Sequence, residues 1–163
     1  MMKVTIVLNG KSVSAEVEPR TSLADLLRSP AFGCTSIHLG CEHGVCGACT
    51  ILIDGRIARS CIALAVACDG LEVTTLEGLE RDELTSQLKD AFHEHHGLQC
   101  GFCTPGMLIS AREIVERNPQ MSEDELRAIM SGNLCRCTGY SGIVAAVGAV
   151  AASRTRSDNP TRS

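Results

Sequence analysis

Four cysteines between residues 41 and 61 constrain this chain more than any other feature. They follow the spacing Cys41-x4-Cys46-x2-Cys49-x11-Cys61, which matches the plant-type ligand pattern of a [2Fe–2S] cluster, with three thiolates in one loop and a fourth farther on. Glycines alternate with these cysteines, and glycine accepts positive φ and lets backbone amides approach sulfur closely. The spacing therefore favours an iron–sulfur site in this loop.

Two other interpretations of the loop are weaker. Cys46-x2-Cys49 alone could be half of a zinc site or a disulfide motif, but this leaves Cys41 without a role. Cys41-x-His43 could be half of a Rieske pair, but the sequence lacks the Cys-x2-His half. We therefore expect His43 to be a loop residue near the cluster and not a ligand.

The composition indicates a core almost without aromatic side chains. The 163 residues include three Phe, one Tyr and no Trp, so Ala, Val, Ile and Leu must fill the interior, and these bury less area than aromatics. Bound metal clusters would supply stabilisation that such a core lacks.

The ten cysteines would indicate a disulfide scaffold in a secreted chain. The start, MMKVTIVLNG, has neither the apolar region of a signal peptide nor a twin-arginine pair, and no run reaches the roughly 18 apolar residues of a membrane span. We therefore expect a cytoplasmic protein, in which closely spaced cysteines more often bind metal or perform redox chemistry. The net charge of −4, without a basic patch with interleaved aromatics, argues against nucleic acid as a partner.

The first 76 residues predict a small mixed β-sheet with one helix. Apolar and polar residues alternate on both sides of Asn-Gly at residues 9–10, a strong signal for a two-residue hairpin turn, and Asp-Gly at 54–55 repeats it. We expect Thr21 to cap a short helix that ends at Pro30. Residues 71–75 are expected to form a closing strand.

The second half predicts four helices followed by a tail. Gly97 suits the C′ position of the first helix, Thr104 is the expected N-cap of the second with Pro105 at N1, and Ser122-x-x-Glu125 forms a capping box. The expected helices span residues 79–96, 104–115, 122–132 and 141–152. The Ser-, Asn- and Pro-rich tail, residues 154–163, is expected to be disordered.

A second set of cysteines lies in the loops that join these helices. Cys100-x2-Cys103 falls between the first and second helices, and Cys135-x-Cys137 falls between the third and fourth. An antiparallel four-helix arrangement places both loops at the same end, so that four thiolates can converge on one metal centre. Taken alone, this set could hold zinc. Beside an iron–sulfur site, a second cluster in electron-transfer contact with the first is favoured.

The remaining candidate residues indicate no catalytic site. Cys34 and Cys68 fit neither set, and we expect them to be small buried apolar residues. His93, His95 and His96 crowd a helix end, where cations favour the helix dipole, and we expect a solvated end rather than a metal site. The sequence contains no Ser/His/Asp set, phosphate loop or catalytic carboxylate pair, so the isolated chain is expected to be catalytically silent.

Both cysteine motifs together resemble a known family. The stretches GCEHGVCGACT…SC and LQCGFCTPGM…GNLCRCTGY resemble the small iron–sulfur subunit of the molybdenum hydroxylases, which include xanthine dehydrogenase, aldehyde oxidoreductase and bacterial carbon monoxide dehydrogenase. The resemblance covers residues 3–152. It implies an α+β fold, with a plant-ferredoxin-like β-grasp domain over residues 1–76 and an all-α four-helix-bundle domain over residues 77–153, each holding one [2Fe–2S] cluster.

The resemblance also implies a role for each motif residue. The implied ligands of the cluster distal to molybdenum are Cys41, Cys46, Cys49 and Cys61. The implied ligands of the nearer cluster are Cys100, Cys103, Cys135 and Cys137. Gln99 would contact the pterin cofactor, and Cys137 would lie closest to the pterin ring. From the residues alone, we expect the Gln99 side chain to make hydrogen bonds within its own loop.

Two partner subunits are implied as well, a large one carrying the molybdenum–pterin dinucleotide and a medium one carrying FAD, in a dimer of heterotrimers. Electrons would pass from molybdenum through the helical-domain cluster and the ferredoxin-like cluster to FAD. Ahead of the first cysteine motif, many relatives carry a longer acidic stretch where this chain has RSPAFGCTSIHLG. We expect this difference to alter a surface loop and the fit to a partner subunit. Two other classes stay open, a free-standing two-cluster ferredoxin and a zinc-stapled interaction module.

Overall fold

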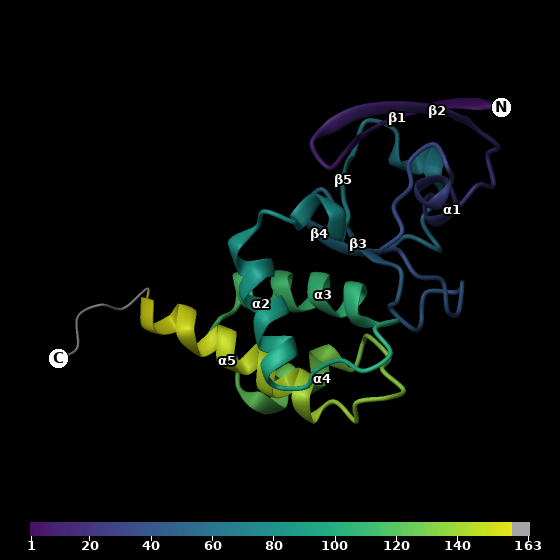
Figure 1. Ribbon diagram of the computed structural model, residues 1–163. Coiled ribbons are helices and arrows are strands. Elements are labelled where there is room, and N and C mark those ends of the chain that lie inside the picture. Colours follow the sequence, from purple (N-terminus) through teal and green to yellow (C-terminus); the bar gives the residue numbers. More distant parts are fainter. Residues whose placement is uncertain (158–163) are drawn as a thin grey trace.

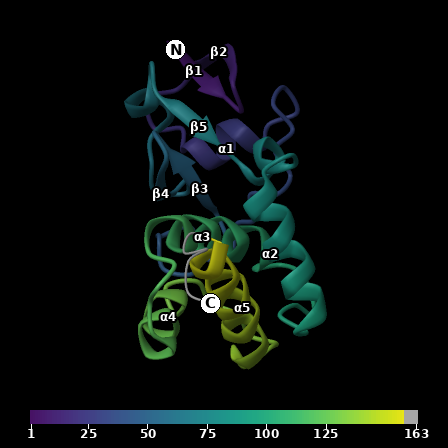
Figure 2. The same ribbon diagram turned by 90° about the vertical axis from the view of Figure 1, so that its left-hand side faces the viewer.

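The structure is a computed structural model that describes residues 1–157. A sheet half, residues 1–75, is stacked on a helical half, residues 76–157 (Figures 1 and 2). The expected α+β class is confirmed. Within the described residues, no helix has the length and apolar character needed to cross a membrane.

The sheet half contains a five-stranded mixed sheet in the order β2-β1-β5-β3-β4. Its strands are β1 (Met2–Leu8), β2 (Lys11–Val17), β3 (Thr50–Ile53), β4 (Arg56–Arg59) and β5 (Glu72–Thr74). Strand β5 pairs in parallel with β1 and antiparallel with β3, and so joins the two hairpins. Both expected hairpin turns are confirmed, because Asn9 and Asp54 have φ of 49° and 47° and each is followed by a glycine at positive φ.

Helix α1 (Leu23–Arg28) covers the sheet with its apolar residues. Its N-cap is Ser22, whose Oγ accepts the backbone N–H of Asp25 at 3.1 Å. The expectation that Thr21 caps this helix is therefore wrong by one position. The carbonyl of Thr21 instead accepts the N–H of Ala65, the first residue of the 3-10 turn η1 (Ala65–Cys68).

The segment before the first cysteine motif, residues 28–40, lies partly at the surface, as expected, but two of its residues, Cys34 and Ile37, are buried. Ile37 is 1% exposed, and the guanidinium of Arg28 donates to its carbonyl. The N–H and hydroxyl of Ser36 donate to the carboxylate of Glu77 at 2.8 and 2.5 Å. Burial alone raises the pKa of Glu77, but hydrogen bonds from Ser36 and Thr75 lower it below its usual value. This carboxylate therefore ties the segment to the start of the helical half.

The helical half contains four α-helices that share one hydrophobic core. They are α2 (Glu83–Glu94), α3 (Thr104–Arg117), α4 (Glu123–Met130) and α5 (Ser141–Ser157), and a 3-10 turn η2 (Leu76–Leu79) precedes them. The expected capping box of α4 is confirmed, because Ser122 and Glu125 each accept the backbone N–H of the other.

The two ends of α2 differ from the expectation. The helix begins at Glu83, where the carboxylate of Asp82 accepts the N–H of Thr85, so that η2 replaces the first expected turn. At the other end His96, with φ of 54°, occupies the C′ position. Gly97 is the next residue, and its N–H donates to the carbonyl of Phe92 at 2.8 Å. A Cβ at Gly97 would lie 3.2 Å from the Phe92 ring, so close packing, and not a positive φ, favours glycine here.

Helices α3 and α5 also differ in detail. Cys103 and not Thr104 is the N-cap of α3, so Thr104 is its first helical residue. Helix α5 continues to Ser157, and the Thr155 hydroxyl donates to the carbonyl of Pro119 at 3.2 Å. The expectation of a disordered tail is therefore wrong for residues 154–157. Its remainder, residues 158–163, lies outside the described residues.

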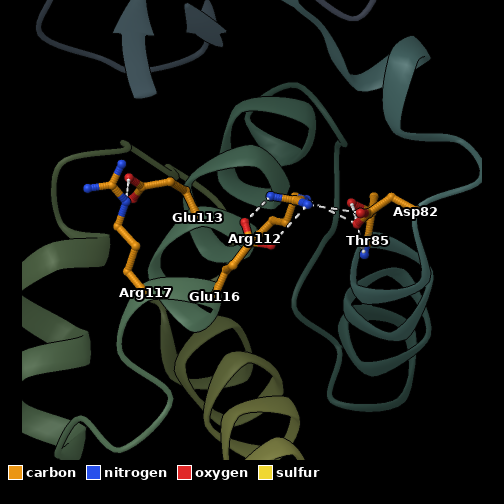
Figure 3. A network of polar contacts seen from close by, with 6 residues as sticks. All are labelled: Asp82, Thr85, Arg112, Glu113, Glu116 and Arg117. Atoms are coloured by element: carbon orange, nitrogen blue, oxygen red, sulfur yellow. Dashed lines mark hydrogen bonds and ion pairs between the residues drawn. The ribbon is translucent and has the colours of Figure 1, made fainter. Parts of the chain in front are cut away.

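An ion-pair network joins α2 to α3 (Figure 3). Arg112 donates to both carboxylate oxygens of Asp82 at 2.9 and 3.0 Å and to Glu116 at 2.5 Å. The hydroxyl of Thr85 donates to Asp82 at 2.7 Å. Burial alone raises the pKa of Asp82, but the bonds from Arg112 and Thr85 lower it to about 2. The network fixes the start of α2 against α3.

Each half has its own core, and a small third cluster joins them. The core of the sheet half includes Cys34 and Cys68, which are 4% and 3% exposed. Their expected burial is confirmed, and it raises the pKa of both thiols. The third cluster consists of Leu52 of β3, Leu79 of η2 and Ile109 of α3. The halves are therefore held together by apolar contacts as well as by the chain.

Candidate iron–sulfur centres

The first cysteine set gathers around the loop between α1 and β3. The hairpin of β3 and β4 returns the chain to this loop, where the hydroxyl of Ser60 donates to the carbonyl of Cys49 at 2.8 Å. The thiols of Cys61 and Cys49 lie within hydrogen-bonding reach. The N–H of Cys46 donates to the sulfur of Cys41 at 3.3 Å. The four cysteines thus meet as two pairs, and the hairpin accounts for the distant fourth member.

Backbone donors surround the first sulfur of this loop. The N–H of Cys46 and, to a lesser extent, that of His43 lower the pKa of Cys41 to about 6. Gly44 has φ of 85°, which lets the loop turn back. The exposed ring of His43 is engaged locally, with Nδ1 2.5 Å from the carbonyl oxygen of Cys41. Burial raises the pKa of Cys61 to about 11.

The second set is assembled from two separate loops. Cys100 and Cys103 lie between α2 and α3, and Cys135 and Cys137 lie between α4 and α5. Both loops are at the same side of the molecule as the first set, at the right in Figure 1. Here too the thiols form pairs, Cys103 with Cys135 and Cys100 with Cys137.

Side chains around Cys135 shape the second set. The hydroxyl of Thr138 donates to the sulfur of Cys135 at 3.1 Å. Burial alone raises the pKa of Cys135, but the hydroxyl and N–H of Thr138 lower it. Burial raises the pKa of Cys103 to about 12. The N–H of Cys135 donates to the Tyr140 hydroxyl at 2.9 Å, and this hydroxyl donates to the carbonyl of Asn133 at 2.9 Å.

The paired thiols suit a two-iron cluster. Across residues 1–157, no three or more His, Cys, Asp or Glu side chains form a group that could hold one metal ion. Side-chain hydrogen bonds pair the cysteines of each set two by two, and a [2Fe–2S] cluster takes two thiolates at each of its irons. Thr104 Oγ1, next to Cys103 in the sequence, is a buried hydroxyl without a partner in the described structure.

The loops that carry the two cysteine sets contact one another. The N–H of Leu134, the residue before Cys135, donates to the carbonyl of Cys46 at 2.8 Å. The other loop of the second set also reaches the loop of the first set, because the ring of Phe102, between α2 and α3, stacks on the ring of His38 with centroids 4.7 Å apart. Sequence reasoning missed these contacts, because neither the cysteine spacing nor any periodicity indicates which residues of two distant loops meet.

One edge of the second set is exposed. Gln99, Cys100 and Cys137 are exposed, and Leu98 and Leu134 nearby are 39% and 53% exposed. Both residues expected to contact a pterin, Gln99 and Cys137, therefore lie where another molecule could reach them.

The three histidines at the end of α2 are exposed as well, as expected.

Comparisons with known proteins agree with this arrangement. A family model described as "2Fe-2S iron-sulfur cluster binding domain" matches residues 6–85, and one described as "[2Fe-2S] binding domain" matches residues 75–148. The chain is 51% identical to the nicotine 6-hydroxylase small subunit of Paenarthrobacter nicotinovorans, over 90% of this chain and 87% of that one. It is 47% identical to the caffeine dehydrogenase subunit gamma of a Pseudomonas species, over 90% and 89% of the two chains.

A solved structure extends the likeness to three dimensions. A chain of quinoline 2-oxidoreductase from Pseudomonas putida 86 is 52% identical and superposes with a TM-score of 0.86, over 95% of this chain and 96% of that one. Sequence and fold thus agree over nearly the whole length. The chain belongs to the family of small iron–sulfur subunits of molybdenum hydroxylases and is a subunit of an oxidoreductase of that type.

Proposed function

We propose that this chain is an electron-transfer subunit that carries two [2Fe–2S] clusters in a molybdenum-containing hydroxylase. Such clusters, when bound, accept and release one electron at a time. The observation that carries the proposal is the gathering of two cysteine sets, each as two pairs of thiols, with a backbone hydrogen bond between their loops.

The proposed ligands follow the two sets. Those of the first cluster are Cys41, Cys46, Cys49 and Cys61, and those of the second are Cys100, Cys103, Cys135 and Cys137. We propose a β-grasp domain over residues 1–76 and a four-helix bundle over residues 77–153. The separate cores of the two halves support this division, as do the family matches to residues 6–85 and 75–148.

The chain's own residues position and tune these centres. The N–H of Cys46 and the hydroxyl of Thr138 donate to the sulfurs of Cys41 and Cys135. Such bonds stabilise added negative charge and so raise a reduction potential. The hydrogen bond from Leu134 to the Cys46 carbonyl gives a short connection between one ligand of each set.

We further propose that the exposed edge of the second set faces the molybdenum–pterin dinucleotide of a large subunit, with Gln99 and Cys137 at the contact. Exposed apolar side chains beside exposed thiols are typical of a protein interface. The loop of the first set has its own exposed apolar residues, Val45 and Ile62, at 59% and 61%. This second surface suits a medium subunit carrying FAD, or another acceptor.

Electrons would then pass from the large subunit through the second set and the first set to FAD. The names of the relatives, "small subunit" and "subunit gamma", support an assembly of several chains. A dimer of heterotrimers follows only from the family resemblance, and a cytoplasmic location only from the sequence patterns. Both stay predictions.

Metal analysis tests the proposal. Iron, acid-labile sulfide, zinc and molybdenum are measured on material purified through a tag on this chain from its native host. We expect about four irons, about four sulfides and about one molybdenum per chain, together with a large partner. Iron and sulfide without molybdenum or partner would indicate a free ferredoxin, and zinc alone would contradict a redox role.

A further inference from the structure

Asn133 lies between the two cysteine sets and is 3% exposed. Its Nδ2 donates to the carbonyl of Gly47 at 3.0 Å and to Oγ1 of Thr50 at 3.2 Å, and its Oδ1 accepts from the hydroxyl of Ser110 at 2.8 Å. Both amide hydrogens and the carbonyl are therefore used. The two residues that accept from Asn133 belong to the loop of the first set and to β3, whereas Asn133 itself stands just before Cys135.

Arg59, the last residue of β4, holds the same segment from a second direction. Its Nη2 donates to the carbonyl of Gly132 at 2.6 Å and lies 3.5 Å from Oδ1 of Asn133. Its Nη1 donates to Oγ1 of Thr50. Three consecutive residues are thus fixed to the sheet half, since the N–H of Leu134 already donates to Cys46.

Close packing restricts movement at the contact between Asn133 and the loop of the first set. A Cβ added to Gly47 would lie 2.7 Å from Nδ2 of Asn133, and a Cβ added to Gly106 of α3 would overlap the carbonyl oxygen of Gly47. The loop of the first set is therefore enclosed between Asn133 and the start of α3. Removing one partner here leaves buried polar groups unpaired, which costs more than the bond itself contributes.

We propose that Asn133 is a positioning residue that fixes the distance and orientation between the two cluster sites. This inference rests on the proposed function. The single bond from Leu134 to Cys46 would leave the second loop free to pivot, and the amide of Asn133 together with Arg59 removes that freedom. Electron transfer and magnetic coupling between two centres both fall steeply with distance, so this fixed contact sets how strongly the two sites communicate.

The halves do not depend on Asn133 to stay together. Leu52, Leu79 and Ile109 form a separate apolar cluster between them, and Ser36 of the sheet half donates to the carboxylate of Glu77 in the helical half. Weakening the Asn133 contact should therefore loosen the two cysteine loops relative to one another while each set stays assembled. Loosened loops with both sets intact would indicate a positioning role, whereas loss of a set would indicate a purely structural role.

The test uses the complete complex purified from its native host, with Asn133→Asp and Arg59→Met compared with the unaltered chain. Asn133→Asp keeps the shape of the side chain and removes both donors. The matched control is Asn9→Asp. Asn9 also joins distant segments, since its side chain donates to Thr75 Oγ1 at 3.0 Å and accepts the N–H of Thr75 at 2.9 Å, but in the described structure these bonds involve no member of either cysteine set. Low-temperature EPR of the reduced complex reports the splitting caused by interaction between the two clusters.

We expect Asn133→Asp and Arg59→Met to keep their iron and both cluster signals but to lose part of the splitting, whereas Asn9→Asp keeps it unchanged. Unchanged splitting in an iron-replete Asn133→Asp would overturn the inference. If Asn133→Asp loses iron, unchanged splitting in Arg59→Met would overturn it, and reduced splitting there would support it. An unaltered complex without two cluster signals would instead refute the proposed function.

Discussion

The two cysteine sets reach the same paired arrangement by different routes. The first is nearly local, with three members in one loop and the fourth returned by a single hairpin, and Cys49 is only 2% exposed. The second is assembled from two loops more than thirty residues apart, and its members Cys100 and Cys137 are exposed. The comparison indicates that the first set depends on backbone conformation within its loop, and the second depends on how four helices pack.

Removing one proposed ligand should have the largest effect. Cys137→Ser should lose the EPR signal of the second cluster and about half of the iron, and leave the first signal in place, because the two sets share no cysteine. Cys68→Ala is the control, since Cys68 is buried in the sheet-half core and belongs to neither set. Two unchanged signals in Cys137→Ser would refute the assignment of this residue.

Gly47→Ala should have the next largest effect, and it tests the local character of the first set. Gly47 has φ of 76°, and a Cβ there would lie 2.7 Å from Asn133 Nδ2. We expect a loss of about 3 kcal/mol in unfolding free energy, from backbone strain and the displaced contact. Gly55→Ala, at φ of 72° with nothing within 4 Å of its Cβ, should lose only about 1 kcal/mol.

Chemical denaturation of the two glycine variants measures this difference. Equal losses would mean that backbone strain alone decides the effect and that the contact between Gly47 and Asn133 contributes nothing.

Asp82→Asn should have a smaller effect, and it tests how far the second set depends on helix packing. The pKa of Asp82 in the folded protein is lowered to about 2. The ionised carboxylate therefore contributes to the free energy of unfolding above the unfolded pKa of about 4, and this contribution is lost as the pH falls towards 2. We expect the variant to lose about 1–2 kcal/mol at pH 7, and the difference should disappear near pH 2.

Unfolding of the Asp82→Asn variant and the unaltered chain across this pH range provides the measurement. Asp90→Asn, at an exposed position of the same helix, is the control and should change little at any pH. A loss that persists unchanged at pH 2 would show that the carboxylate charge is not the cause.

Thr138→Val should have the smallest effect, a shift in the reduction potential of one cluster without loss of that cluster. The Thr138 hydroxyl donates to the sulfur of Cys135, and this bond favours the more negative reduced state. Its removal should lower the reduction potential of the second cluster and leave the first unchanged in an EPR-monitored redox titration. Thr138→Ser retains the hydroxyl and should keep the original potential. A shift in the first cluster would reverse the assignment of the two signals.

The same contrast explains what the sequence could predict. Glycine turns, the capping box and the cysteine spacings are local patterns, and they predicted both hairpins, four helices and the two candidate sets. The errors at Thr21, Gly97 and Thr104 are each one residue in size, because several neighbouring residues could fill the same capping position. Helix α5 extends past residue 153, where the Thr155 hydroxyl donates to the carbonyl of Pro119, a contact that no local pattern encodes.

The junction between the sets was not predictable for the same reason. Asn133 has no distinctive spacing, and its partners Gly47 and Thr50 are more than eighty residues away. Only the packing of α3 and the loop after α4 against β3 brings these groups together. The resemblance to a family implied a ligand set by motif, but it did not indicate which contacts hold the two halves in a fixed relative position.

Spin quantitation by EPR of the fully reduced complex tests the central claim most directly. Each reduced [2Fe–2S] cluster contributes one unpaired electron, so two clusters predict about two spins per chain, in two signals. A single signal with about one spin per chain would contradict the account, because one of the two cysteine sets would then hold no cluster.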